Sequence, residues 1–591
     1  MREAAMAAWW KERVVYQIYP RSFQDSNGDG IGDIPGIISR LDALKDLGAG
    51  IIWLSPVYPS PDADNGYDIS DYRDIDPRFG TMTDMEALIE EAGKRDIKIV
   101  MDLVINHTSD EHEWFQKSRD PASEYRDYYI WQPPKPGGGL PNNWRGFFVE
   151  DAWEFDPRSG EYYLHLFHKK QPDLNYKNPK VIEEIKGILR FWLDKGVAGF
   201  RCDVINVLYK TSLANGKGGI LPGLERYKCQ EGNHEILREL RRDVLDAYDC
   251  FTVGESVMVD LDEAKLLCGE DRHELNMVFY FEHLEVDRRV AKYIPKRFKA
   301  AKLLEVLTKW QQGLEWNAVY LENHDQSRIV SHYGDDRAYW ERSAKLLAVL
   351  ELTLRGTPFI YQGQEIGMTN FDFTGFEQLN DVESLNMNAL LKRRHVPAGL
   401  RWKWIRAASR DNARTPMQWS VQSEGTEGPF GLLGSFGSMV QNCTTDGAGF
   451  TTGKPWLGIN ANHRRINYEA QAGDPGSVLS FYKKLIALRA SSETLKYAPF
   501  TPRYAKGQVI AYDREGKDEV WTAILNFSGK RADLAGALRA AGADDDCVIA
   551  ASNTGRTALT GRLEPWEALV LARAKALRCP EQPANSPLSC G

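Results

Sequence analysis

Cysteine is scarce in this sequence, and long apolar runs are absent. The 591 residues include eight cysteines and no Cys-x-x-Cys pair, so no zinc site or thiol redox site is indicated. No window reaches the roughly 18 uninterrupted apolar residues of a membrane helix. The N-terminus, MREAAMAAWWKERVVYQ, also lacks the apolar segment of a secretory signal. We therefore expect reduced thiols and a cytoplasmic protein without a membrane partner.

An excess of positive charge is absent as well. Lys and Arg total 74 against 83 Asp and Glu, which gives a net charge of −9 at pH 7. No basic tract is dense enough to indicate binding to nucleic acid or to an anionic membrane. With 42% apolar and 11% aromatic residues, the chain can bury a large core in two or three domains. We expect a monomer that acts on a small neutral partner.

Eight short runs rich in β-branched and aromatic residues alternate with amphipathic stretches such as MEALIEEAGKR. The runs are 14–20, 50–56, 97–104, 197–204, 251–256, 275–281, 316–322 and 357–363. This alternation predicts parallel strands joined by helical crossovers. Eight such units predict an α/β fold, a (β/α)₈ TIM barrel, whose active site lies at the C-terminal ends of its strands.

Ionisable side chains gather where these predicted strands end. Arg201 and Asp203 lie two residues apart in GFRCDVIN, so in a strand they share a face. Glu255 ends the fifth run. The third and seventh runs lead into DLVINHTSD and ENHDQSR, which place Asp102, Asn106, His107, His324 and Asp325 at the same rim. One such residue alone is usually a cap or an ion pair. A set at one rim predicts an active site.

DLVINH, GFRCDVIN, VGES and ENHD resemble the four ordered motifs of the α-amylase-type glycoside hydrolases, family 13. QPDLN (171–175) and RDNARTPMQW (410–419) resemble the branch of that family that contains oligo-1,6-glucosidases and other α-glucosidases. The resemblance implies an enzyme that cleaves short α-glucosides with retention at the anomeric carbon.

Retaining cleavage uses one ionised carboxylate to attack the anomeric carbon and one protonated carboxyl to donate to the leaving oxygen. The resemblance assigns these roles to Asp203 and Glu255. We expect Arg201 to keep Asp203 ionised, because a nearby cation favours the charged form. Glu255 has no charged neighbour in FTVGESV, so we expect burial to keep it protonated.

The resemblance gives three more residues contacts with the sugar. Asp325 is expected to accept hydrogen bonds from its hydroxyl groups. His107 and His324 are expected to be hydrogen-bonding residues rather than metal ligands, because no His-x-x-x-His or Glu-x-x-His spacing surrounds them.

Asp68 in NGYDI and Arg410 resemble the family's pair that clamps a terminal glucose, which implies a closed pocket and removal of end units. Between Arg410 and Arg414, the motif favours Arg410. Tyr67 and Phe167 would offer aromatic faces to the sugar's C–H groups, with core packing as the alternative.

Val204 directly follows Asp203. In the resembled family a valine here accompanies α-1,6 cleavage, and the alternative is that Val204 only packs behind the strand. We therefore expect glucose release from the non-reducing ends of isomaltose, isomaltooligosaccharides and panose. Preference for α-1,4 links, sucrose cleavage, and transglycosylation or sucrose isomerisation remain alternatives. FDFTGFEQLNDVESLNM lacks the Arg-rich run of sucrose isomerases, which disfavours the last. The carboxylates disfavour a non-catalytic binding subunit.

DSNGDGIGD (25–33) has the spacing of a calcium loop, although the twelfth position is Gly36 where an EF-hand has Glu. The candidate ligands are Asp25, Asn27, Asp29, the Ile31 carbonyl and Asp33. The resemblance implies a structural Ca²⁺, or Mg²⁺, remote from the sugar. A polar turn without a metal is the alternative.

The predicted barrel is interrupted once and followed by a different pattern. We assign residues 1–103 and 176–495 to the barrel, and 104–175, rich in Trp, Tyr, Pro and Gly, to an inserted domain. The resemblance implies that this inserted domain roofs the active site. Short alternating runs predict an antiparallel β domain over 496–575, and 576–591 has the composition of a disordered tail.

Overall fold

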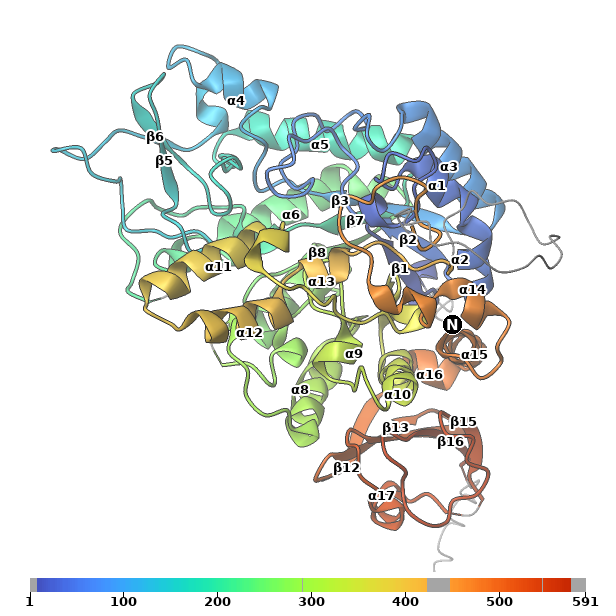
Figure 1. Cartoon of the computed structure of the whole chain (residues 1–591). Helices are drawn as coiled ribbons and strands as arrows, with labels where there is room; N and C mark the ends of the chain where they lie inside the picture. Colours follow the sequence, from blue (N-terminus) through green and yellow to red (C-terminus); the bar gives the residue numbers. More distant parts are fainter. Residues whose placement is uncertain (1–7, 220, 290, 422–446, 545, 576–591) are drawn as a thin grey trace, which may run out of the picture.

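The computed structural model describes residues 8–219, 221–289, 291–421, 447–544 and 546–575. Eight parallel strands form a nearly closed barrel in the order β10-β11-β1-β2-β3-β7-β8-β9 (Figure 1). They are β1 (Val15–Ile18), β2 (Ile51–Leu54), β3 (Lys98–Leu103), β7 (Gly199–Cys202), β8 (Phe251–Glu255), β9 (Met277–Phe279), β10 (Ala318–Val319) and β11 (Thr357–Tyr361). Each lies inside one of the eight predicted runs, so the barrel prediction is confirmed.

Helices cover the outside of the barrel and bury apolar stripes against its strands. On α5, residues Val181, Ile185, Ile188 and Trp192 recur at helical spacing and are all buried. The covering helices are α1 (Ile34–Ser39), α2 (Leu41–Leu47), α3 (Met82–Lys94), α5 (Pro179–Asp194), α6 (Glu231–Asp243), α7 (Leu261–Cys268), α8 (Ala300–Gly313), α9 (Ile329–His332) and α10 (Trp340–Thr353). Later in the chain come α14 (Tyr468–Ala472), α15 (Val478–Ser491) and α16 (Glu493–Tyr497).

The segment between β3 and β7 carries a small antiparallel sheet in the order β4-β6-β5. It comprises β4 (Trp131–Gln132), β5 (Trp153–Asp156) and β6 (Glu161–Leu164), preceded by α4 (Glu113–Ser118). The ring of Phe115 on α4 stacks on Trp131 and meets Tyr163 edge-on, which fixes the helix to the sheet. The inserted sheet is therefore confirmed, while its domain limits at 104 and 175 stay predictions.

A helical hairpin after β11 was not predicted from the sequence. It consists of α11 (Val382–Arg393) and α12 (Ala398–Ala408), and α13 (Asp411–Arg414) follows it. Figure 1 shows α11 and α12 side by side, on the side of the barrel from which β5 and β6 project. The hairpin and the inserted segment together border the mouth of the barrel.

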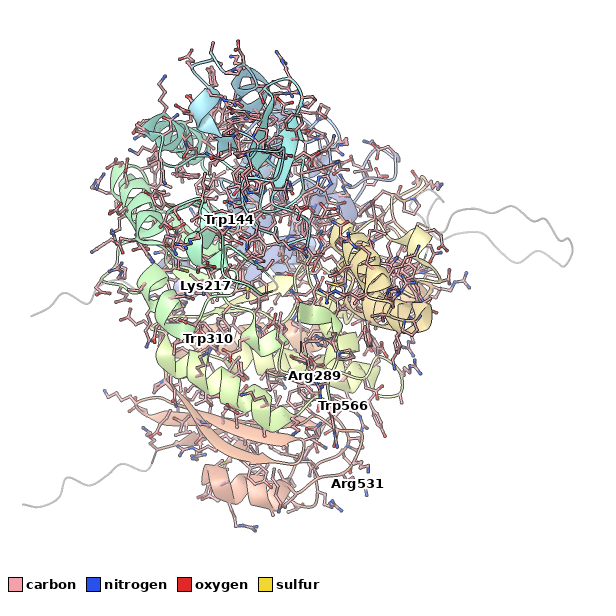
Figure 2. The ribbon with its side chains drawn as sticks, turned by 90° about the vertical axis from the view of Figure 1, so that its left-hand side faces the viewer. Trp144, Lys217, Arg289, Trp310, Arg531 and Trp566 are labelled. Carbon is pink, nitrogen blue, oxygen red and sulfur yellow. The ribbon has the colours of Figure 1, made fainter. Side chains whose placement is uncertain are left out.

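The C-terminal part forms a five-stranded antiparallel sheet in the order β12-β13-β14-β16-β15. The strands are β12 (Phe500–Lys506), β13 (Val509–Glu515), β14 (Glu519–Asn526), β15 (Val548–Ser552) and β16 (Ala568–Ala574), with α17 (Leu534–Ala541). Alternate residues face opposite ways: Ile510 and Tyr512 join the main core, whereas Val509 and Ala511 pack under α17. Figure 2 shows this unit below the barrel, with Trp566 near the junction. The predicted β domain is confirmed, and the predicted tail 576–591 lies outside the described residues.

Two predictions based on absences can be compared with the described part of the chain. No helix there is long and apolar enough to cross a membrane. Its five cysteines, Cys202, Cys229, Cys250, Cys268 and Cys547, are all free.

Candidate active site

A cavity of about 1310 Å³ opens at the C-terminal ends of the barrel strands. Glu255 is the last residue of β8 and Asp203 follows β7, so both carboxyl groups reach its floor. The predicted site residues that line it are Tyr67, His107, Phe167, Asp203, Val204, Glu255, Asp325 and Arg410. Arg201 and His324 do not line the cavity, but they contact Asp203 and Tyr67, which do. Asp68 is not among the residues that line the cavity.

Arg201 holds three carboxyl groups in the floor of the cavity. Its Nη1 donates to Asp203 Oδ1 at 2.6 Å and to Asp102 Oδ1 at 2.7 Å, and its Nη2 contacts Glu255 Oε2. Glu255 has no charged neighbour within FTVGESV, but Arg201 on the adjacent strand supplies one. β7 and β8 are adjacent parallel strands with Cys202 opposite Gly254, which brings the guanidinium within reach of the next strand's final side chain.

Burial raises the pKa of each carboxyl group that Arg201 contacts. Burial raises the pKa of Asp203 to about 7, although Arg201 opposes the rise. Burial likewise raises the pKa of Glu255 to about 7, against Arg201 and with the help of the Asp203 charge. The pKa of Asp102 rises to about 6, again through burial. One guanidinium thus faces three buried carboxyl groups, and near neutral pH the Asp203–Glu255 pair holds a proton between them.

The pKa of Asp325 is lowered, whereas those of Asp203 and Glu255 are raised. Arg414 Nη2 donates to its Oδ1 at 2.7 Å, Arg410 Nη1 lies 3.3 Å from the same atom, and His324 Nε2 lies 3.1 Å from Oδ2. Burial alone would raise the pKa of Asp325, but His324 and the two arginines lower it well below the usual value. Asp325 is therefore a fixed anion at the cavity wall. Both arginines of RDNARTPMQW reach it, and of the two only Arg410 lines the cavity.

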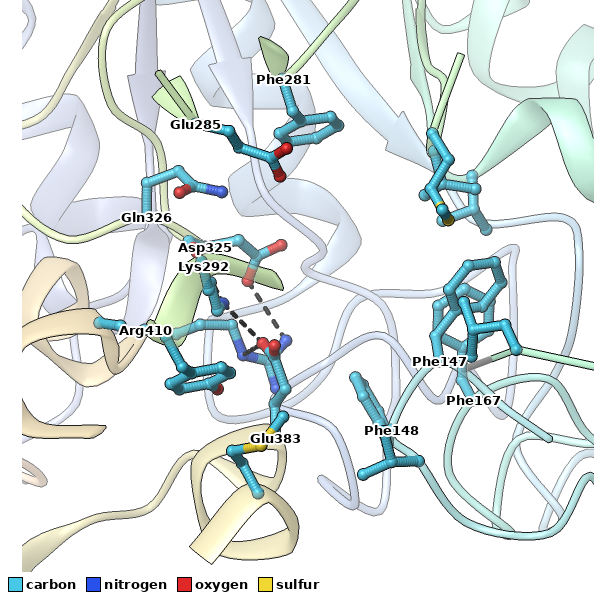
Figure 3. A pocket seen from close by; sticks show the side chains of 18 of the residues that line it. Phe147, Phe148, Phe167, Phe281, Glu285, Lys292, Asp325, Gln326, Glu383 and Arg410 are labelled. Carbon is cyan, nitrogen blue, oxygen red and sulfur yellow. Dashed lines mark hydrogen bonds and ion pairs between the residues drawn. The ribbon is translucent and has the colours of Figure 1, made fainter. Parts of the chain in front are cut away.

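Arg410 forms an ion pair with Asp64 at the cavity wall, and the assignment of Asp68 to this pair was wrong. Arg410 Nη2 donates to Asp64 Oδ1 at 3.2 Å, and both residues line the cavity (Figure 3 shows Arg410). Asp68 turns away and accepts hydrogen bonds from Ser60 Oγ and from the backbone N–H groups of Ala63 and Asp64. Its carboxylate shapes the loop that presents Asp64.

Aromatic and imidazole rings form one side of the pocket. Tyr67 stacks on His324 with ring centroids 5.2 Å apart, and its hydroxyl lies 2.6 Å from His324 Nε2. Phe167 contacts the His107 ring at 5.2 Å. Burial lowers the pKa of His107 to about 4, so its ring is neutral and suited to hydrogen bonding. Gln171, from QPDLN, lies 3.1 Å from His107 Nε2 and also lines the cavity.

Val204 lines the cavity and belongs to the same buried hydrophobic cluster as Phe148 and Phe167. Its backbone is left-handed, with φ at 37° and ψ at 40°. A β-branched residue in that region is strained, and such strain concentrates at functional sites. The chain turns there directly after Asp203 and begins a short 3₁₀ helix, Ile205–Val207.

Asn206 is the last residue of GFRCDVIN, but it was not predicted to be a site residue. Its Nδ2 donates to the Val257 carbonyl at 2.9 Å, and its Oδ1 accepts the Val257 N–H at 3.0 Å. This pair of bonds joins the loop after Asp203 to the turn after Glu255. This contact cannot be predicted from the spacing of residues in the sequence, because it depends on β7 and β8 being adjacent strands of the barrel.

Several side-chain carboxylates of the 25–33 loop accept hydrogen bonds from backbone N–H groups of the same loop. Asp25 accepts the N–H groups of Asn27, Gly28 and Gly30, and Asp29 accepts that of Ile31. Asp33 caps α1 through the Gly36 N–H. In the described parts of the chain, no three His, Cys, Asp or Glu side chains form a group that could hold a metal. The oxygen donors of the predicted set, which also includes Asn27 and the Ile31 carbonyl, suit Ca²⁺ chemically.

A family model described as "Alpha amylase, catalytic domain" matches residues 17–428 and 439–498. The chain is 49% identical to an oligo-1,6-glucosidase of Parageobacillus thermoglucosidasius over 88% of this chain and 91% of that one. It is 43% identical to a trehalose-6-phosphate hydrolase of Bacillus subtilis (strain 168) over 89% and 90%. Among solved structures, an isomaltulose synthase mutant from Erwinia rhapontici NX5 with sucrose has a TM-score of 0.87, at 39% identity, over 96% of this chain and 99% of that one.

Proposed function

The chain belongs to the α-amylase family of glycoside hydrolases, and from this premise we propose that it is a retaining, exo-acting α-glucosidase specific for short α-1,6-linked glucosides. The observation that carries the proposal is the pair of carboxyl groups of Asp203 and Glu255 on one guanidinium, in a cavity that the Asp64–Arg410 ion pair also lines.

The first half of the reaction forms a covalent intermediate. Asp203 attacks the anomeric carbon while Glu255 transfers its proton to the leaving oxygen, so the C1–O bond breaks as the glucosyl ester forms. Arg201 contacts both carboxyl groups, which lets it stabilise Asp203 before attack and Glu255 after proton transfer. Asp325, already anionic, accepts hydrogen bonds from the sugar and stabilises positive charge at the ring.

In the second half, Glu255 takes a proton from water, and the resulting oxygen attacks C1. The ester bond to Asp203 breaks and glucose leaves with the original anomeric configuration. The Asp64–Arg410 ion pair lines the cavity, where it would clamp a terminal sugar, and this supports release of single glucose units.

Two observations support the α-1,6 preference. The curated relatives with 45–49% identity include four oligo-1,6-glucosidases. In addition, Val204 lies at the cavity wall next to Asp203, where a stiff side chain limits the path of the second sugar.

The decisive experiment is a substrate panel with identified products. Purified protein is incubated with isomaltose, maltose, sucrose, panose, soluble starch and trehalose 6-phosphate, and the products and their initial anomeric form are determined by NMR. We expect α-glucose from isomaltose and panose and negligible action on starch. Preferred cleavage of maltose or of trehalose 6-phosphate would reject the α-1,6 specificity, and conversion of sucrose to an isomer would reject hydrolysis as the main activity.

We also propose that the loop of residues 25–33 carries a structural Ca²⁺ or Mg²⁺. Support comes from its alternating oxygen donors at Asp25, Asn27, Asp29, Ile31 and Asp33. Because these residues do not line the catalytic cavity, the cation would stabilise the loop and take no part in the reaction.

A further inference from the structure

The turn that follows Glu255 forms an apolar wall at the cavity mouth. Val257, Met258 and Val259 all line the cavity. Met258 is 58% exposed, and it is the only large exposed apolar side chain of the described residues that lines the cavity. An exposed methionine inside a functional pocket has no packing role to explain it, since Met258 belongs to none of the hydrophobic clusters.

The position of Met258 is fixed by its backbone. Its φ is 53°, a left-handed conformation that a side-chain-bearing residue adopts at a cost. Two side chains hold the turn. The Asn206 side-chain amide forms hydrogen bonds with both the N–H and the carbonyl of Val257, and Lys228 Nζ donates to the Met258 carbonyl at 3.2 Å. The structure therefore maintains a strained turn that keeps a flexible apolar side chain in the mouth.

The wall extends beyond this turn. Leu221, Leu224 and Phe147 line the same cavity. Figure 3 shows Phe147, Phe148 and Phe167 on one side of the pocket, opposite the polar side chains of Glu285, Gln326 and Asp325. Met258 lines this same cavity together with Val257 and Val259.

Glu255, the proposed proton donor to the leaving oxygen, and the turn that follows it line the same cavity, so an aglycone can lie against Val257, Met258 and Val259. A second sugar offers hydroxyl groups, for which Val257, Met258 and Val259 have no side-chain donor or acceptor. An aliphatic chain there would lose contact with water and leave no hydrogen bond unmade.

We propose that the protein also cleaves α-glucosides of aliphatic alcohols, with Met258 as the specificity-determining residue for the alkyl group. The inference rests on the proposed α-glucosidase function of the same site. Asp203 bonds to C1 as the C1–O bond to the alkoxy group breaks, and the Glu255 proton moves to that oxygen to release the alcohol. Water then hydrolyses the glucosyl ester, with its proton returned to Glu255.

The test compares octyl α-glucoside with methyl α-glucoside, each kept below any micelle-forming concentration, by glucose release from the full chain. We expect kcat/KM for the octyl compound to exceed that for the methyl compound by about 10-fold or more, because each buried methylene adds to transition-state binding. A ratio within about twofold of unity would overturn the proposal.

Three variants assign the effect to the side chain. Met258→Gln keeps an unbranched chain of similar length but adds polarity, and it should lower the octyl-to-methyl ratio of kcat/KM at least about threefold. Met258→Leu should retain the ratio. Leu266→Gln is the matched control, since Leu266 is a 44% exposed apolar residue on α7 that does not line the cavity. Equal losses on both substrates in Met258→Gln would refute the assignment, and if that variant fails to fold, the parent ratio and Met258→Leu decide.

Isomaltose, assayed in parallel, separates this inference from the proposed function. Cleavage of isomaltose without an octyl preference overturns the aliphatic inference alone. An octyl preference without cleavage of isomaltose supports the inference and rejects the α-1,6 specificity.

Discussion

Arg201 donates to Asp203 through one guanidinium nitrogen and contacts Glu255 through the other. A single cation therefore serves both the proposed nucleophile and the proposed acid. Since Asp102 shares the first nitrogen, the charge on Asp203 and Glu255 is determined jointly rather than residue by residue.

Asp203→Asn should lower kcat by about 10⁴-fold or more, because the amide keeps the geometry but cannot form the glucosyl ester. Intact-mass spectrometry after reaction with 5-fluoro-α-glucosyl fluoride checks this, since the parent should accumulate a glucosyl adduct and the variant should not. A crystal structure should show the two carboxyl groups about 5–5.5 Å apart. Near-normal turnover by the variant would remove Asp203 from the role of nucleophile.

Glu255→Gln should stabilise the protein at alkaline pH. The pKa of Glu255 is raised from 4.5 to about 7 by burial, so the folded state binds a proton that the unfolded state has already lost. The stability from this proton is fully present below pH 4.5 and is lost as pH rises through about 7. The glutamine of the variant is neutral at every pH. The free energy of unfolding of the variant, relative to that of the parent, should therefore increase by about 1–3 kcal/mol from pH 5 to pH 8.

Denaturant titrations at both pH values measure this difference. Glu235→Gln, at an exposed position on α6, is the control for the substitution itself. A Glu255→Gln advantage that is independent of pH would contradict the buried, proton-binding carboxyl.

Asp64→Asn and Asp68→Asn should have different effects although the residues lie in one loop. Asp64 faces the cavity and Arg410, so its replacement should lower kcat/KM by about 10- to 100-fold, as loss of a charged hydrogen bond to substrate does. Asp68 accepts backbone N–H groups only within its loop, so its replacement should cost about 1–3 kcal/mol of stability first. Steady-state kinetics and urea denaturation of both variants distinguish the two roles. A larger kinetic loss in Asp68→Asn would restore the assignment made from the motif.

Val204→Thr should raise maltose cleavage relative to isomaltose cleavage. Threonine keeps the β-branched shape in the left-handed turn but replaces a methyl group with a hydroxyl at the cavity wall. Discrimination by one such wall is about 1–3 kcal/mol, or roughly 10- to 200-fold in kcat/KM. The ratio of kcat/KM for the two disaccharides, in parent and variant, is the measurement. A parent that prefers maltose, or a ratio that does not move, would assign Val204 to packing alone.

Removal of divalent cations should lower the Tm more than it lowers the rate at low temperature. A cation bound to the folded loop stabilises it by mass action, and the loop lies away from the reacting groups. Calorimetry and rate assays with EDTA, then with added Ca²⁺ or Mg²⁺, test this, and Asp29→Asn should weaken the restoration. Bound Ca²⁺ would show ligand distances of about 2.3–2.6 Å, against about 2.0–2.1 Å for Mg²⁺. Loss of activity with an unchanged Tm would contradict a structural role.

The barrel was predictable because its signals are local. Buried parallel strands read as continuous apolar runs, and helices between them repeat at three- and four-residue spacing, so each strand could be found alone. Asp203 and Glu255 were found for the same reason, since each ends such a run. The hairpin of α11 and α12 was missed, as only Ile405 and Ala408 are buried on α12 and the apolar pattern is correspondingly weak.

The contacts that depend on neighbouring elements were not predictable. Asp64 and Asp68 are equivalent acids in PDADNGYD, and the left-handed turns at Asn65 and Gly66 between them decide which one faces the cavity. The contact of Arg201 with Glu255 follows from the order of strands in space. A sequence without pairing information cannot supply that order.

The place of β1 between β2 and β11 has a consequence for biosynthesis. The N-terminal strand leaves the ribosome first, yet one of its two partners is encoded more than half the chain later. At roughly 5–20 residues per second, its free edge waits tens of seconds for that partner. The nascent barrel therefore passes through a long open stage with unpaired backbone at β1, during which a molecular chaperone has the greatest opportunity to protect it.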